Sequence, residues 1–358
     1  MKYLHLMSNE KFIIPYIEFV EENFLIIDHF FYIIGGVDYV EVIKRNFIKS
    51  YISKSSNKIL RKLYIIWAYI VLYPKAFKSK KIILHGLFDP LTILFLFLNP
   101  WFLKKCDWVM WGGDLYSYRN RNQNTLLKKI YYKIEDYVKG KMSGYITHVE
   151  GDYELAKKWC GAKGIYYDCF MYLSNVYRDV ELKELSKDEI NIQVGNSADP
   201  SNNHLEILDK LVKFKEKNIK VFCILSYGDK EWAKKVIEYG KNKLGDKFIP
   251  IIDFMKFQEY MEFISKIDIA IFAHNRQQAV GNITSLLSMG KTVYLKKEVT
   301  TYRMLKELNI KVEDFNEFNK IELLSEEDRK NNKKIIKNRF SKERLKNDWK
   351  IIFEDNIK

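Results

Sequence analysis

The feature that most constrains the fold of this chain is a repeated alternation of short apolar runs, polar or glycine-containing turns, and helical patterns. The clearest instance is residues 267–295, which read as strand, polar turn, helix, glycine and strand: IDIAIFAHNRQQAVGNITSLLSMGKTVYL. The same order recurs over residues 3–159 and again from residue 190. A helix between two strands carries the chain back to the end of the sheet where the first strand began, so such strands pair in parallel. The sequence therefore predicts an α/β chain built on parallel sheets.

The length of the chain favours two domains, because 358 residues exceed what a single hydrophobic core usually serves. The polar, charged stretch 173–189 is the expected boundary. We predict two Rossmann-like, doubly wound domains facing a central cleft, followed by a helical tail: residues 1–175, residues 185–325 and residues 326–358. Within the first domain, helices are expected over 39–52 and 57–73. Ligands of doubly wound sheets bind at the carboxyl ends of the strands, so those ends would line the cleft.

The polar turn within 267–295 predicts an anion site. Four amide side chains and an arginine lie within the eight residues 275–282, at the start of an expected helix, which exceeds what helix capping needs. A helix N-terminus and charge-assisted hydrogen bonds favour a phosphate there. The candidate residues are Asn275, Arg276, Gln277, Gln278, Gly281 and Asn282. The alternative is a solvated loop that only caps the helix.

Three further turns are expected to complete this site. In VGNSADPSNNH (194–204), Gly195, Asn196 and Ser197 follow a strand and could offer backbone N–H groups, and Asn202 could contact the same ligand. Tyr227 and Gly228 are further candidates. So are Asp253 and Phe254, and this second pair could frame a nucleobase. For VGNSADPSNNH and for Asp253, ordinary turn or cap chemistry is the alternative.

In the N-terminal half, WGGDLY (111–116) places Asp114 after two glycines at the end of a strand. A hydroxyl group that attacks a carbon centre needs a base or a hydrogen-bond acceptor, and Asp114 could serve as either. His85, at the end of a neighbouring strand, could assist. A helix-capping Asp114 and a structural His85 are the alternatives.

Four short motifs carry a resemblance to a known family: HGLFD (85–89), WGGDLY, VGNSADPSNNH and NRQQAVGN (275–282). Together they resemble the TDP-4-acetamido-4,6-dideoxygalactose (N-acetylfucosamine) transferases of enterobacterial common antigen synthesis, which are GT-B glycosyltransferases. The resemblance implies transfer from a TDP-sugar to a polyprenyl-diphosphate-linked glycan, without cofactor or metal. The chain also has no D-x-D motif of the kind that binds a metal in GT-A enzymes. Many GT-B enzymes place an acidic ribose contact in the helix after the donor turn. Here that stretch has no glutamate, so Asn282, Thr284 or Ser285 would have to substitute.

The positive charge of the chain predicts an anionic partner. The net charge is +14, and residues 42–88 hold eleven Lys or Arg and no Asp or Glu. These basic residues flank the aromatic run LYIIWAYIVLY (63–73), which suits an anionic membrane surface. We therefore expect a peripheral enzyme at the cytoplasmic face of the bacterial inner membrane. A buried helix with solvated lysines is the alternative reading of this segment.

Two rival functions remain open from the sequence. The basic, aromatic surface could bind nucleic acid, although no recognition motif of that kind is present, so no nucleic-acid partner is expected. The same fold could also serve a nucleotide-sugar epimerase or a pyruvyl transferase, neither of which requires a membrane-facing domain.

Overall fold

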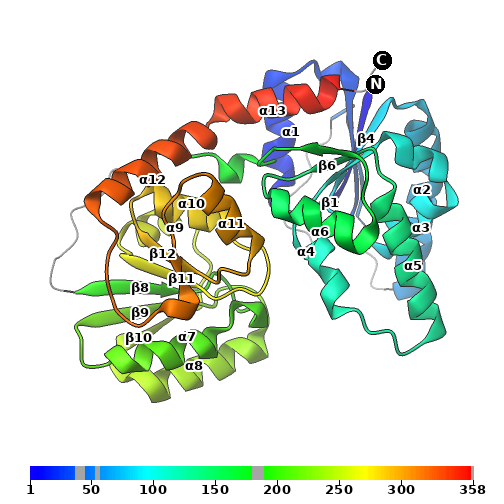
Figure 1. The fold of residues 1–358 in the computed structure, drawn as a ribbon. Coiled ribbons are helices and arrows are strands. Elements are labelled where there is room, and N and C mark those ends of the chain that lie inside the picture. Colours follow the sequence, from blue (N-terminus) through cyan, green and yellow to red (C-terminus); the bar gives the residue numbers. More distant parts are fainter. Residues whose placement is uncertain (37–44, 53–56, 180–188, 356–358) are drawn as a thin grey trace. The chain divides into compact units, whose positions relative to one another are not determined.

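The computed structural model describes residues 1–36, 45–52, 57–179 and 189–355, and these form two compact units (Figure 1). Unit 1 comprises residues 1–174 with the C-terminal residues from 342, and unit 2 comprises residues 175–341. Part of the expected boundary stretch, residues 180–188, lies outside the described residues. Each unit is built on its own parallel sheet, as the alternation of apolar runs and helical patterns predicts.

Among the described residues of unit 1, the sheet has seven strands in the order β3-β2-β1-β4-β5-β6-β7, and each neighbouring pair is parallel. The strand order reverses between β1 and β4, which makes their carboxyl ends the switch point of a doubly wound sheet. The strands are β1 (Tyr3–Asn9), β2 (His29–Gly36), β3 (Ile48–Tyr51), β4 (Lys81–His85), β5 (Cys106–Val109), β6 (Gly144–Ile146) and β7 (Ile165–Tyr167). The helices are α1 (Ile13–Asn23), α2 (Lys58–Lys78), α3 (Pro90–Leu98), α4 (Gly113–Tyr116), α5 (Leu126–Gly140), α6 (Glu150–Cys160) and α13 (Lys342–Glu354).

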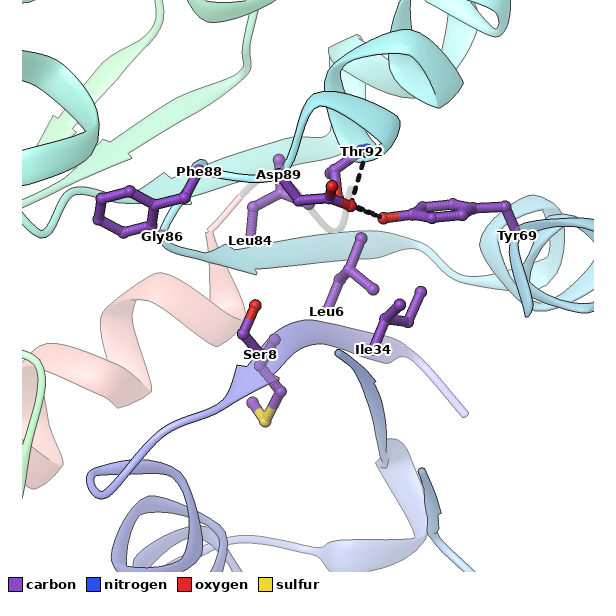
Figure 2. A pocket seen from close by; sticks show the side chains of 10 residues that line it. Leu6, Ser8, Ile34, Tyr69, Leu84, Gly86, Phe88, Asp89 and Thr92 are labelled. Carbon is purple, nitrogen blue, oxygen red and sulfur yellow. Dashed lines mark hydrogen bonds between the residues drawn. The ribbon is translucent and has the colours of Figure 1, made fainter. Parts of the chain in front are cut away.

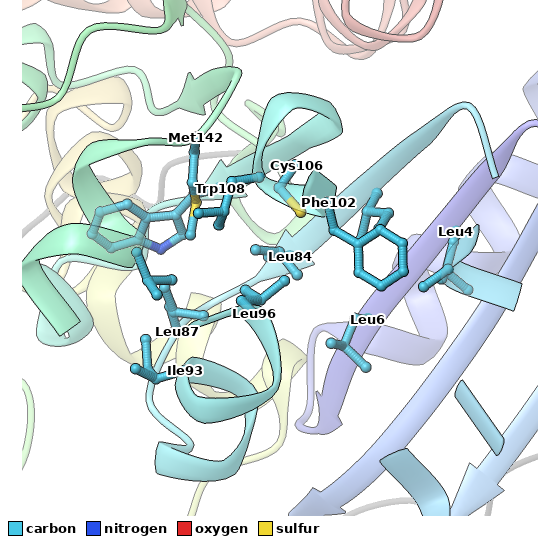
Figure 3. Close-up of a cluster of buried hydrophobic side chains, with 14 of the residues drawn as sticks. Leu4, Leu6, Leu84, Leu87, Ile93, Leu96, Phe102, Cys106, Trp108 and Met142 are labelled. Atoms are coloured by element: carbon cyan, nitrogen blue, oxygen red, sulfur yellow. The ribbon is translucent and has the colours of Figure 1, made fainter. Parts of the chain in front are cut away.

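The hydrophobic core of unit 1 lies between the sheet and the helices α2, α3 and α5. Side chains alternate between the faces of a strand, so Leu4 and Leu6 of β1 point to this core while His5 points to the other face. Trp108 of β5 is fully buried in the same cluster, next to Leu87 and Leu96 (Figure 3). The core therefore fixes the carboxyl ends of β1, β4 and β5 relative to one another.

Among the described residues of unit 2, the sheet has six parallel strands in the order β10-β9-β8-β11-β12-β13. Its strand order reverses between β8 and β11, so the switch point lies between their carboxyl ends. The strands are β8 (Ile190–Val194), β9 (Ile219–Ile224), β10 (Phe248–Ile251), β11 (Ile269–Phe272), β12 (Thr292–Leu295) and β13 (Glu313–Asp314). The helices are α7 (His204–Leu211), α8 (Lys230–Leu244), α9 (Phe257–Ser265), α10 (Val280–Ser288), α11 (Thr300–Glu307) and α12 (Glu326–Arg339).

The C-terminal segment differs from the single tail expected over 326–358. Helix α12 belongs to unit 2, whereas α13 belongs to unit 1. Polar contacts anchor α13 to unit 1: the Trp349 indole donates to the Met171 carbonyl at 2.9 Å, and the Tyr167 hydroxyl donates to Asp355 at 2.8 Å. Trp349 is also buried against Tyr16 of α1, with ring centroids 5.0 Å apart. Trp349, Ile352 and Phe353 of α13 are thus buried in the first unit, whereas Ile351 is exposed.

The prediction of a helix over 39–52 is wrong for the second half of that range. Residues 37–44 lie outside the described residues, and Ile48–Tyr51 form strand β3, which pairs in parallel with β2. Along β3, Lys49 is exposed and Tyr51 is buried, stacked on Tyr32 with 4.9 Å between ring centroids. Helix α2 also continues past the expected end at residue 73, through Pro74 to Lys78, with Ala76 buried in the core. In both places, tertiary packing outweighs the local pattern.

Candidate functional site

Three loops meet at the switch point of unit 2, after β8, β9 and β11. The Ser201 hydroxyl donates to Gln278 Oε1 at 2.8 Å, and Gln278 Nε2 donates to Asn196 Oδ1 at 3.3 Å. Asn196 Nδ2 in turn donates to the Tyr227 hydroxyl at 3.0 Å. The structure thus brings together three of the residues that the sequence nominated, Asn196, Tyr227 and Gln278, from three separate turns.

Asn202 holds these loops together from within. Its side chain is 0% exposed, so it supports the site rather than contacting a ligand, contrary to the sequence prediction. Asn202 Oδ1 accepts from the Asn196 backbone N–H at 2.9 Å and lies 2.9 Å from His274 Nε2, which must therefore carry its proton there. Burial, reinforced by the charge of Arg276, lowers the pKa of His274 to about 3, so this imidazole is neutral near pH 7.

The turn that follows β8 does not offer free backbone donors in the way we expected. Gly195 N donates to the Ile271 carbonyl at 3.0 Å, and Ala198 N donates to the Tyr227 carbonyl at 2.7 Å. Gly195 has a φ of +64°, and a Cβ there would come within 2.8 Å of the Asn202 side-chain oxygen. Ser197 is buried beside Asn202, whose amide donates to its hydroxyl at 3.3 Å. This turn is a packed support, and the buried side chain of Asn196 links it to Tyr227 and Gln278.

Gly228 helps to pack the loop after β9 against the turn after β8. A Cβ at this position would lie 2.9 Å from the backbone of Ala198, with which Gly228 forms a parallel bridge. Its small size therefore allows the loop after β9 to lie directly against the loop after β8. The glycine brings Tyr227 to Asn196 and does not itself point to a ligand.

The N-terminus of α10 lies at the turn for which the sequence predicts an anion site. Ala279 precedes the helix in a left-handed conformation and its side chain makes no cap, so the amides of the first turn, which include those of Gly281 and Asn282, are not capped by it. Arg276 lies in the preceding loop, half-buried, with Nη1 donating to the Gln277 carbonyl at 3.2 Å. Asn275 Oδ1 accepts from Lys296 at 3.3 Å. Lys296 is also paired with Glu206 at 2.7 Å, so Arg276 and the helix N-terminus are the positive features that adjoin Gln278 along the chain.

Two parts of the predicted donor set lie elsewhere. Thr284 is buried, and its hydroxyl lies 3.0 Å from the Val280 carbonyl of its own helix, which turns it away from the surface and removes it as a ribose contact. Asp253 and Phe254 follow β10, which is separated from β8 by β9, and both side chains are exposed. The described contacts of unit 2 do not join them to Asn196 or Gln278.

Asp114 is a structural carboxylate, not the accessible base that the sequence suggested. It is 1% exposed, and both of its oxygens are occupied. Oδ2 accepts from Leu87 N at 2.9 Å and Trp108 Nε1 at 2.7 Å, and Oδ1 accepts from Trp111 N at 3.0 Å and Leu115 N at 3.1 Å. Burial raises the pKa of Asp114, opposed by nearby Lys139 and by these hydrogen bonds. An acceptor hydroxyl could reach Asp114 only by displacing this network.

His85 is also enclosed, in a chain of hydrogen-bonded rings on the α1 and α13 side of the sheet. The Trp111 indole donates to the Tyr172 hydroxyl at 2.8 Å, which leaves the hydroxyl proton for His85 Nδ1, also at 2.8 Å. His85 Nε2 then lies 3.1 Å from His5 Nδ1, and His5 Nε2 lies 3.0 Å from His29 Nδ1. Burial lowers the pKa of His85 to about 3 and that of His29 to about 4. This row of hydrogen-bonded rings carries no net charge near pH 7, and it orients Trp111.

A half-buried carboxylate of this region is Asp89, which belongs to the motif HGLFD and for which the sequence suggested no role. Asp89 lines a pocket with about 320 Å³ of empty space, including open solvent, at the switch point between β1 and β4 (Figure 2). The pocket residues are Leu6, Met7, Ser8, Ile34, Tyr69, Leu84, Gly86, Phe88, Asp89 and Thr92. The half-buried carboxylate accepts from the Tyr69 hydroxyl at 2.5 Å and caps α3 through Leu91 N and Thr92 N. A polar residue at a strand's carboxyl end, just before a Pro-initiated helix, was the available signal.

Comparison with known proteins places this arrangement among glycosyltransferases. A family model described as "4-alpha-L-fucosyltransferase glycosyl transferase group 56" matches residues 40–350. Among solved structures, the chain is similar to HepE from Anabaena in complex with UDP and glucose, with a TM-score of 0.66 and 10% identity over 98% of this chain and 99% of that one. A structure described as "Trehalose-6-phosphate from E. coli bound with UDP-2-fluoro glucose" matches with a TM-score of 0.63 and 10% identity, over 99% of this chain and 100% of that one. At such identities these matches establish the fold, which is GT-B.

Replacing Asp114 by Asn should destabilise unit 1 by about 2–3 kcal/mol, because the amide NH₂ would face N–H donors and leave buried groups unsatisfied. Urea unfolding monitored by tryptophan fluorescence would measure this loss. Asp246→Asn, at an exposed position in unit 2, is the matched control and should unfold like the wild type. Wild-type stability of the Asp114→Asn variant would show that the network is not required.

Acidification from pH 6.5 to pH 5 should lower the free energy of unfolding. Burial lowers the pKa of His29, His85, His204 and His274 to about 3 or 4, so the unfolded chain, with imidazole pKa values near 6.5, binds more protons in this window. Stability is full above pH 6.5, and each such histidine adds a slope of up to about 1.4 kcal/mol per pH unit below it. Urea titrations at pH 7, 6 and 5 would measure the slope, and His274→Gln should reduce it by one histidine's share. Equal stability at pH 7 and pH 5 would contradict the assignment.

Proposed function

The chain belongs to glycosyl transferase group 56, the 4-alpha-L-fucosyltransferase family, and from this premise we propose that it transfers a 4-amino-4,6-dideoxy sugar of the N-acetylfucosamine type from a TDP-sugar to a polyprenyl-diphosphate-linked glycan. It is a Leloir glycosyltransferase with the GT-B fold. Family membership argues against the epimerase, pyruvyl transferase and nucleic-acid-binding alternatives.

The observation that carries the donor assignment is the switch-point site of unit 2. Asn196 and Gln278 form a linked pair of amides beside the N-terminus of α10, with Arg276 in the adjacent loop. Helix amides and a guanidinium stabilise negative charge, which suits a diphosphate leaving group. HepE, which is similar in fold, is described in complex with UDP and glucose, and this supports a nucleotide sugar as the donor.

The choice of TDP and of a 4,6-dideoxy amino sugar rests on the four motifs that resemble N-acetylfucosamine transferases. The family description supports the sugar class, because fucose is itself a 6-deoxy hexose. The chain supplies its own positive charge for the diphosphate. In the part of the chain that the structure describes, no group of three or more His, Cys, Asp and Glu side chains is arranged to hold a metal ion.

For the acceptor we propose the pocket of unit 1 that contains Asp89. In the transfer, the acceptor hydroxyl oxygen bonds to the anomeric carbon, the bond from that carbon to the diphosphate oxygen breaks, and its electron pair stays on the diphosphate. The hydroxyl proton passes to a base, and Asp89 is the half-buried carboxylate that lines the pocket. The Tyr69 hydroxyl, bonded to Asp89 at 2.5 Å, would hold that carboxylate in place. A lipid-linked acceptor would locate the reaction at the cytoplasmic face of the inner membrane.

Replacing Arg276 by Ala should weaken TDP binding by about 1.5–3 kcal/mol, the scale of a hydrogen bond to a charged group. A thermal-shift titration would measure the change, and Arg303→Ala on α11 should bind TDP like the wild type. In a panel of TDP, UDP, GDP and CMP, we expect the largest stabilisation from TDP. Unchanged TDP affinity in Arg276→Ala would remove this loop from the diphosphate site, and no stabilisation by any nucleotide would refute the donor assignment.

Replacing Asp89 by Asn should lower kcat about 100-fold, the scale of a lost general base, with TDP affinity unchanged. Asn is also a good helix N-cap, so α3 should remain folded. Asp229→Asn, which makes the same change at the N-cap of α8, is the matched control and should keep full activity. A fully active Asp89→Asn enzyme would exclude Asp89 as the base.

A further inference from the structure

Helix α2 is apolar on both of its faces. Its inner face, with Ala68 and Leu72, is buried in the core of unit 1. On the outer face, Leu63, Trp67, Ile70 and Phe77 recur at helical spacing, and Ile70 and Phe77 are 66% and 64% exposed. A helix of this kind is normally enclosed by other parts of the protein, so its outer face indicates a partner.

The apolar surface continues onto two neighbouring helices. Helices α2, α3 and α5 cover the same face of the unit 1 sheet (Figure 1). Leu98 of α3 and Leu127 of α5 are 63% and 79% exposed, and Phe97 and Tyr137 join these two helices edge to face at 5.9 Å. Isolated exposed apolar residues are common, but large ones on three adjacent helices form an interaction surface. We call the outer side of these three helices the apolar face.

The charges that accompany the apolar face are basic. Helices α2 and α3 contain no Asp or Glu. Arg61 and Lys62 of α2 and Lys128 and Lys129 of α5 are exposed. Helix α5 has two acidic residues: Glu135 is buried and paired with Lys139 at 2.6 Å and Arg121 at 2.8 Å, and the partly exposed Asp136 is paired with Arg121 at 2.7 Å. Apolar and aromatic side chains beside unopposed cations match the interfacial region of a bilayer that contains anionic lipids.

We propose that the apolar face is a docking surface for an anionic phospholipid bilayer, on which unit 1 lies without crossing it. In the part of the chain that the structure describes, no helix is both long and apolar enough to span a membrane. The proposal deepens the membrane component of the proposed function, and it assigns that contact to three helices rather than to the basic segment alone. Tyr69 of α2 and Thr92 of α3 also line the pocket of Asp89, so the helices that contact the lipid also form the proposed acceptor site.

Flotation of the full-length protein with vesicles tests this surface. Binding to phosphatidylcholine vesicles that contain phosphatidylglycerol should exceed binding to phosphatidylcholine alone and should weaken with added salt. Leu63→Gln with Ile70→Gln should lower partitioning by roughly tenfold or more. Leu25→Gln with Ile27→Gln changes two residues that are equally apolar and more exposed, but outside the apolar face, and should partition like the wild type. Arg61→Ala with Lys62→Ala should lower binding to the anionic vesicles about fivefold for each charge.

Two results would overturn the proposal. The first is a wild-type protein that does not bind the anionic vesicles. The second is a Leu63→Gln, Ile70→Gln variant that changes from dimer to monomer in sedimentation while its vesicle binding is unchanged, since the face would then join two copies of the chain. Failure of docking remains distinguishable from failure of the proposed function. TDP stabilisation is measured on the full-length protein without vesicles, and vesicle binding is measured without donor.

Discussion

The parallel pairing of every strand is the constraint from which the positions of the functional residues follow. Parallel strands require crossover helices, and both faces of each sheet must be covered. The loops at the carboxyl ends of the strands therefore lie along one edge of each sheet. Where the strand order reverses, the loops on either side lead away in opposite directions and leave a crevice between them. In unit 2 this point lies between β8 and β11, where Asn196 meets Gln278. In unit 1 it lies between β1 and β4, where the pocket of Asp89 opens.

Fully buried polar side chains hold these loop clusters in shape. Asp114 accepts four hydrogen bonds from the chain around the ends of β4 and β5, and Asn202 joins the loops after β8 and β11. A buried polar group is costly unless it is hydrogen-bonded, so each of these residues confines its partners to one arrangement. Their burial also keeps them from substrate. The groups able to meet a ligand are their half-buried neighbours, Asp89 and Gln278.

Helices α2, α3 and α5 meet two separate demands. Their inner faces close the core of unit 1, as Leu72 and Leu96 show, and this burial stabilises the fold. Their outer faces keep large apolar side chains in contact with water, which contributes nothing to the fold of the isolated chain. The second apolar face is therefore explained by a partner outside the chain. In the proposed reaction the acceptor is lipid-linked, so a bilayer would be that partner.

The sequence by itself determined the α/β class, the two parallel sheets and the polar loops that meet at the switch point of unit 2, because these follow from local periodicity and from turn chemistry at strand ends. It also predicted Asn196 and Gln278 among the residues that meet. It could not separate contacting from supporting residues: Asp114, His85, Asn202 and Thr284 have the chemistry of a site but are buried. It also misread β3 as a helix and missed the division of the C-terminal segment between the units. Burial and hydrogen-bond partners depend on residues distant in sequence, so only the tertiary structure decided which polar side chains remain open to a ligand.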